Sequence, residues 1–130
     1  MKKRNIYWII AGLIDLLTTF VHLIAGQIDL VNPLLNSELQ LQTKTEWLGV
    51  WHAISVFLLF HTIILLRYGF NKTKIPPIDL LTYLGWFYLL IAIPFMIVSG
   101  IQSTLAPQFI IFLPIGIFIL LGIKKHKQYA

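Results

Sequence analysis

A stripe of polar side chains runs along the first apolar stretch of the sequence. Asp15, Thr18, Thr19 and His22 have the spacing i, i+3, i+4 and i+7, so they share one face of a helix, which Gly26 continues. A carboxylate and an imidazole on one face can share a proton or bind a polar ligand. The stripe is the first candidate for chemistry in this chain.

A second apolar stretch carries two histidines and a serine. His52 and His61 are nine residues apart, which places them on opposite faces of a straight helix, and Ser55 accompanies His52. Counted from the outer ends of their stretches, His22 and His52 fall at similar depths, so His52 is the expected neighbour of His22. His61 is expected to face another helix or an inner vestibule, where a packing hydrogen bond is its simplest role.

These residues fit more than one kind of site. His22 and His52 are candidate ligands for a metal ion or a haem iron, but no third and fourth ligand accompanies them. A proton relay, or recognition of a polar headgroup, by Asp15 and the histidines asks less of the geometry. No cofactor is identified, and the absence of a hydrolase or metalloprotease motif favours a protein that is not an enzyme.

The elements that position these residues are membrane helices. The chain has 130 residues, of which 58% are hydrophobic and 12% charged, and its mean hydropathy is +0.81. A spanning helix needs roughly 20 predominantly apolar residues. Four such stretches predict an all-α, four-helix membrane bundle forming one domain over residues 1–130, with spans at residues 6–25, 46–67, 79–100 and 105–123.

Basic residues indicate how these spans are oriented. Of the 10 Lys and Arg residues, only Lys44 falls in a connection on the opposite side from the rest. The other nine flank the remaining span ends: Lys2, Lys3, Arg4, Arg67, Lys72, Lys74, Lys124, Lys125 and Lys127. This positive-inside pattern predicts that both termini are cytoplasmic, with a bacterial cytoplasmic membrane as the expected location. Topology accounts for the net charge, so lipid and not nucleic acid is the expected partner.

Two features of the connections carry structural expectations. Residues 27–45 form a long, unusually apolar external connection, in which Asn32 and Pro33 favour a short interfacial helix. Thr43 and Glu46 have the Thr-x-x-Glu spacing of a capping box, which predicts that the second span begins near Lys44.

Prolines interrupt the last two spans. Pro94 and Pro114 each remove one helical hydrogen bond and free a carbonyl four residues earlier. Both prolines are expected near the depth of His22 and His52, so these residues could line one outward-facing cavity. Four aromatic residues, Trp8, Tyr83, Trp86 and Tyr88, are expected to serve packing or interfacial anchoring.

Three functions remain open from the sequence. The first is binding or transport of a small ligand, ion or proton by an outer-half pocket formed by Asp15, His22 and His52. The second is an accessory subunit, in which the stripe docks a membrane-protein partner or a second copy of the chain. The third is a membrane haem protein or enzyme.

Overall fold

The computed structural model describes residues 4–71 and 76–128, and these residues form helices joined by short connections. Four helices are long and apolar enough to cross a membrane. The main helices are α1 (Ile6–Gly26), α3 (Leu41–Phe70), α4 (Ile78–Gln102) and α5 (Gln108–Gln128). The all-helical fold and the four apolar spans expected from composition are therefore confirmed, and two of the four helices, α3 and α4, extend beyond both predicted ends.

The first connection is much shorter than expected. After Gly26 the chain continues through a π-helical turn, η1 (Gln27–Val31), into the short helix α2 (Asn32–Asn36). Pro33 is tolerated because it lies in the first turn of α2, where its missing N–H costs little. The expected length of this connection, residues 27–45, was wrong, because the apolar residues after Gly26 continue the helix and only residues 37–40 are not helical. The short helix expected at Asn32 and Pro33 is present as α2, and its place at a membrane interface stays a prediction.

The second span also begins earlier than the capping pattern predicted. α3 starts at Leu41, and its first cap, Gln40, makes no side-chain hydrogen bond. Thr45 donates instead to its own helix at Leu41 O (2.9 Å), while Gln42 bonds Glu46 one turn later (2.6 Å). The capping box at Thr43 and Glu46 was wrong, since both residues lie inside the helix.

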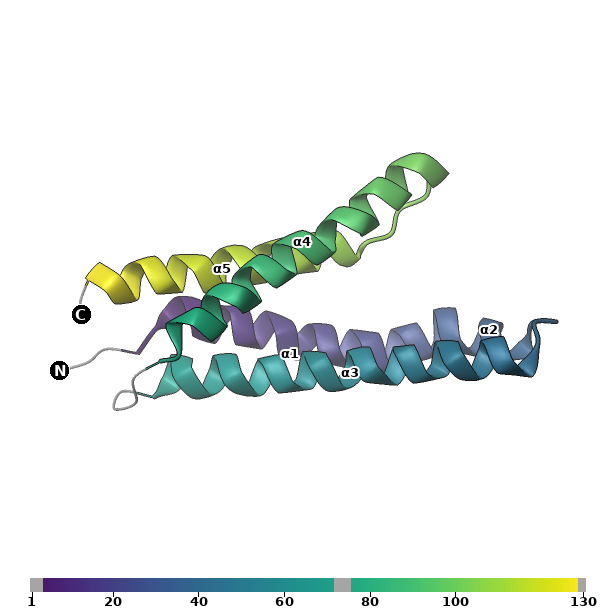
Figure 1. The fold of residues 1–130 in the computed structure, drawn as a ribbon, viewed down its shortest axis with the longest axis horizontal. Helices are drawn as coiled ribbons and strands as arrows, with labels where there is room; N and C mark the ends of the chain where they lie inside the picture. The colour runs from purple at the N-terminus through teal and green to yellow at the C-terminus, as the bar shows by residue number, and fades with distance from the viewer. Residues whose placement is uncertain (1–3, 72–75, 129–130) are drawn as a thin grey trace.

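The helices pair into two antiparallel hairpins (Figure 1). α1 packs along α3 and α4 packs along α5, while α1 also packs against α5 and joins the two pairs. Figure 1 shows the hairpins close together where α1 begins and α5 ends, and diverging toward the opposite end. We call these the closed end and the splayed end.

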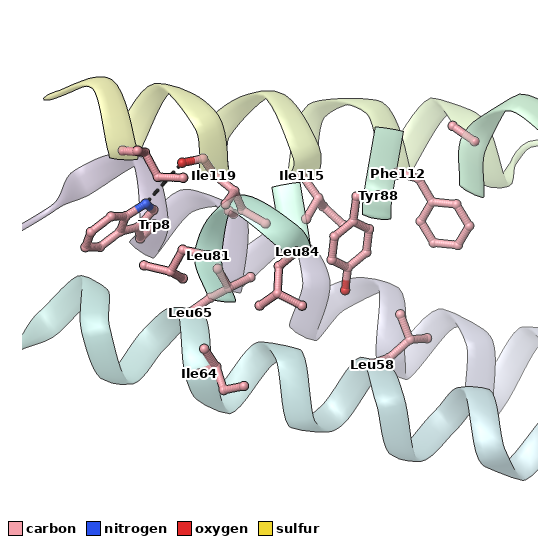
Figure 2. Close-up of a cluster of buried hydrophobic side chains, with 13 residues drawn as sticks. Trp8, Leu58, Ile64, Leu65, Leu81, Leu84, Tyr88, Phe112, Ile115 and Ile119 are labelled. Atoms are coloured by element: carbon pink, nitrogen blue, oxygen red, sulfur yellow. Dashed lines mark hydrogen bonds between the residues drawn. The ribbon is translucent and has the colours of Figure 1, made fainter. Parts of the chain in front are cut away.

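Hydrogen bonds from the first turn of α1 hold the closed end. The Asn5 side chain caps α1 at Trp8 N (3.4 Å) and donates to Gly122 O of α5 (2.8 Å), and the Asn5 backbone N–H donates to Gly69 O of α3 (3.0 Å). The Trp8 indole donates to Ile119 O of α5 (3.1 Å), as Figure 2 shows. Carbonyls of α5 thereby accept from side chains and a carbonyl of α3 accepts from a backbone N–H, which fixes the start of α1 against both neighbours.

Small residues allow the same end to pack tightly. A Cβ on Gly69 would lie 2.9 Å from Ile9 N, and a Cβ on Gly122 would collide with the Trp8 indole. Close helix approach at glycine is the usual basis of packing between membrane helices. The buried apolar core extends from there toward the middle of the bundle (Figure 2), and comprises side chains that include Trp8, Leu65, Leu81, Leu84, Tyr88, Ile115 and Ile119.

Candidate functional site

Asp15 lies at the centre of a buried polar cluster in the middle of the bundle. Its exposed fraction is 0%, and both carboxylate oxygens accept hydrogen bonds from other helices. The Tyr88 hydroxyl of α4 donates to Oδ1 (2.6 Å) and the Thr62 hydroxyl of α3 donates to Oδ2 (2.9 Å). One carboxylate thus connects three helices.

His61 extends this cluster by one further hydrogen bond. Its Nδ1 lies 3.1 Å from the Tyr88 hydroxyl oxygen. Tyr88 has a single hydroxyl proton, and that proton is directed to Asp15, so His61 must donate through Nδ1–H. Asp15, Tyr88 and His61 therefore form a continuous chain of carboxylate, phenol and imidazole, and with Thr62 they make up what we call the polar cluster.

The two threonines of the predicted stripe are buried but bond within their own helix. Thr18 donates to Ile14 O (2.8 Å) and Thr19 donates to Asp15 O (2.9 Å). Such bonds satisfy a hydroxyl without a second helix. Thr18 and Thr19 complete the buried face of α1 while leaving the contacts to other helices to Asp15.

The structure places His22 apart from the polar cluster and gives it a different neighbour from the one expected. Its ring stacks on Trp51 (centroids 3.8 Å apart), and Nε2 lies 3.2 Å from Trp51 O. Ser55 donates to the same carbonyl (3.1 Å), whereas the His52 side chain is exposed. His22 and His52 are similar in depth, but Trp51 occupies the face of α3 that packs on α1.

Pro94 lies inside α4 and Pro114 inside α5, and no histidine lines the groove beside Pro94. Pro94 lines an open groove of about 390 Å³ at the splayed end, between η1 and the α4–α5 hairpin. The residues lining this groove are Leu30, Pro94, Phe95, Val98, Leu105, Ala106, Pro107 and Gln108. His22, His52 and Pro114 are not among them, so this groove is not the cavity expected from depth, which stays a prediction.

A metal site receives no support from the side chains that lie together. Within residues 4–71 and 76–128, no three His, Cys, Asp or Glu side chains gather closely enough to hold a metal ion. The partners of Asp15 are two hydroxyl groups, and both donate hydrogen bonds to its carboxylate oxygens. The arrangement is suited to holding a proton.

Sequence reasoning missed Thr62 and assigned Tyr88 to packing. Counted from the closed end, Asp15 is nine residues into α1, Tyr88 is ten into α4, and Thr62 is eight from the end of α3. At roughly 1.5 Å per residue these positions agree within about 3 Å in depth. The depth comparison, extended from ionisable residues to hydroxyl groups, would have identified both partners of Asp15.

No protein-family model matches the chain, and neither a curated protein nor a solved structure does. Function must therefore be argued from the side chains that the fold brings together.

Proposed function

We propose that this chain is a multi-pass membrane protein that binds and releases a proton at Asp15, with Tyr88 and His61 as the route by which the proton moves. The observation that supports it best is the unbroken chain from the fully buried Asp15 carboxylate through the Tyr88 hydroxyl to His61 Nδ1. Ionisable groups at bilayer depth are costly and typically mark proton or ligand pathways.

The proposed orientation places the closed end in the cytoplasm. Arg4, Arg67 and Lys124 lie near helix ends at the closed end, where the positive-inside rule puts basic residues. Lys2, Lys3, Lys72 and Lys74, which contribute to the same bias, lie outside the described residues. The splayed end then faces outward, with α2 near the outer interface.

The proton moves by exchange of hydrogen bonds along the cluster. A proton arriving at His61 Nε2 gives an imidazolium, whose Nδ1–H bond breaks as that proton passes to the Tyr88 oxygen. The Tyr88 O–H bond breaks in the same step, and its proton joins Asp15 Oδ1. The products are neutral imidazole with Nε2–H, an intact phenol and a carboxylic acid, so charge and atoms balance.

The competing role is purely structural, in which the cluster only joins helices. Buried hydrogen bonds between membrane helices typically contribute about 0.6 kcal/mol each, so packing alone is a sufficient reason for a hydroxyl pair. It is a weaker reason for a carboxylate, because an amide in the same place could bond both hydroxyls without carrying charge. Asp15→Asn therefore separates the two roles.

The test is infrared difference spectroscopy on the purified protein in lipid vesicles while the pH is changed. A band from the C=O stretch of a protonated carboxyl should appear in the wild-type protein and in Asp79→Asn, whose carboxyl is exposed in the first turn of α4. The part of this band that comes from the buried, hydrogen-bonded Asp15 carboxyl should be absent from Asp15→Asn, whereas the exposed Asp29, Glu38, Glu46 and Asp79 keep their own contribution. A spectrum that Asp15→Asn leaves unchanged, or one without any such band, would contradict the proposal.

A further inference from the structure

A small slot opens beside the polar cluster, between α3 and α4. Its volume is about 50 Å³, and its walls are Ile54, Phe57, Leu58, His61, Phe87, Tyr88, Ile91 and Phe112. We propose that this slot binds the hydroxyl group of a membrane-dissolved alcohol or phenol, with His61 Nε2 as the acceptor. The inference deepens the proposed proton site, because it names the kind of molecule that meets the far end of the relay.

The unbonded nitrogen of His61 provides the binding atom. Nδ1–H is committed to Tyr88, so in the neutral ring Nε2 carries a lone pair and accepts hydrogen bonds. His61 is only 6% exposed, and Nε2 makes no hydrogen bond to any of the residues that the structure describes. Nε2 is not one of the fully buried polar atoms that lack a partner, so it keeps accessible surface, and a ligand hydroxyl in the slot can donate to its lone pair.

Aromatic rings shape the rest of the slot. Phe57, Phe87 and Tyr88 surround the imidazole, with ring centroids 6.1, 5.7 and 5.6 Å from its own. Phe112 closes the α5 side against Tyr88, at 5.9 Å. None of the residues lining the slot is charged at neutral pH apart from any proton on His61. The walls therefore favour a neutral, largely apolar ligand.

A lone water molecule fits this slot less well than an alcohol. Water or a hydroxyl group needs roughly 10–15 Å³, so the volume is sufficient for either, but a buried water usually makes about three hydrogen bonds. The slot offers Nε2 and one remaining lone pair of the Tyr88 oxygen. An alcohol needs only the first of these, because its carbon chain contacts the aromatic walls.

The slot is reached from the lipid-facing side of the bundle. Phe57 is 59% exposed and Ile54 is 39% exposed, whereas the His61 side chain between α3 and α4 is buried. A ligand dissolved in the bilayer can therefore insert its hydroxyl group and leave its chain among the lipids. Passage through the bundle is not required.

The test uses 15N-histidine-labelled protein in lipid vesicles, with 1-decanol and decyl methyl ether as probes. The Nε2 resonance of His61, assigned with His61→Gln, should shift saturably with decanol. Decanol should bind about fivefold more tightly than the ether, the ratio expected for one hydrogen bond. His52→Gln, which changes an exposed histidine of the same helix, should leave the response unchanged.

A second variant guards against misfolding of His61→Gln. Ile54→Trp fills the mouth of the slot while keeping His61, and it should weaken the decanol response about tenfold or more. Equal responses to both probes, or none, would overturn the inference. If the Nε2 chemical shift shows a hydrogen bond before decanol is added, bound water occupies the slot and the inference is overturned. If the Asp15 carboxyl band persists in these samples, the proton proposal survives that failure.

Discussion

The two ends of the bundle are built in different ways. At the closed end, Asn5 and Trp8 bond the backbone of α3 and α5, and glycines bring the helix backbones together. At the splayed end, α1 and α3 stay in contact through His22 and Trp51, whereas α4 diverges from the first hairpin and packs mainly along α5.

The polar cluster lies between the tightly packed closed end and the point where the two hairpins begin to diverge. Among the described residues, the hydrogen bonds that join the two hairpins come from Asn5, Trp8 and Tyr88, and those of Tyr88 lie farthest from the closed end. Figure 2 shows the Tyr88 hydroxyl pointing from α4 toward the first hairpin. Whatever alters the bonding of Tyr88 should therefore alter the angle between the hairpins.

The largest effect is expected at the closed end, from Gly69→Ala. The added methyl group would meet the backbone of α1 at Ile9 N, which cannot turn aside, so α1 and α3 must separate. The free energy of unfolding, measured by SDS titration, should fall by about 2–3 kcal/mol. Gly100→Ala is the control, because a Cβ there meets no atom within 4 Å. Equal losses in both variants would show that the tight contact is not what holds this end.

Tyr88→Phe should act next most strongly and chiefly on the splayed end. It removes the donor to Asp15 and the acceptor of His61, with an expected loss of about 2 kcal/mol. Spin labels at the exposed positions Val50 and Val98 should report longer and broader distances. Tyr83→Phe, on an exposed tyrosine of the same helix, should change neither quantity. An unaltered Val50–Val98 distance would mean that Tyr88 does not restrain the hairpins.

Thr62→Val should have a smaller effect confined to stability. The change preserves shape but leaves Asp15 Oδ2 without its donor, for an expected loss of about 1 kcal/mol. Because Thr62 joins α3 to α1 within one hairpin, the Val50–Val98 distance should stay the same. Thr82→Val is the matched control, because it removes only a hydrogen bond from Thr82 to Ile78 O of the same helix (2.7 Å). A longer Val50–Val98 distance in Thr62→Val would contradict the claim that Thr62 stabilises only the first hairpin.

Pro94→Ala should have the smallest effect on stability and still change shape. Restoring the missing helical hydrogen bond should straighten α4 and shift the Val50–Val98 distance, with less than about 1 kcal/mol of change in unfolding free energy. Pro107→Ala is the control, because Pro107 lines the same groove but lies outside the helices. If both variants leave the distance unchanged, the splay does not depend on Pro94.

Composition was sufficient for the four helices, but their ends were harder to predict. The Thr-x-x-Glu pattern at Thr43 marks a helix start only when the preceding residues are not helical, and here Leu41 and Gln42 are. Similarly, nothing in the composition of residues 27–36 distinguishes an apolar loop from a helix that continues through a π turn. Both ambiguities are settled by backbone hydrogen bonds that sequence patterns do not specify.

The candidate site was predictable in part. Spacing alone placed Asp15 on a face with Thr18 and Thr19, and that face is buried. The pairing of His22 with His52 considered depth without the helix face, and one residue along α3 turns the side chain by about 100°. Trp51 therefore meets His22, while Thr62, eleven residues further and on the same face, meets Asp15.

The unequal lengths of the two hairpins have a consequence for the surrounding lipid. The continuous helix from Ile6 to Asn36 has 31 residues and α3 has 30, whereas α4 has 25 and α5 has 21. At roughly 1.5 Å per residue the first hairpin is about 45 Å long, well above a hydrocarbon thickness of about 30 Å. The two hairpins therefore extend by different amounts beyond such a layer, and in the proposed membrane protein we expect them to tilt by different amounts. The angle at which they diverge should then follow membrane thickness, and lipid composition becomes a variable that sets the opening beside Tyr88.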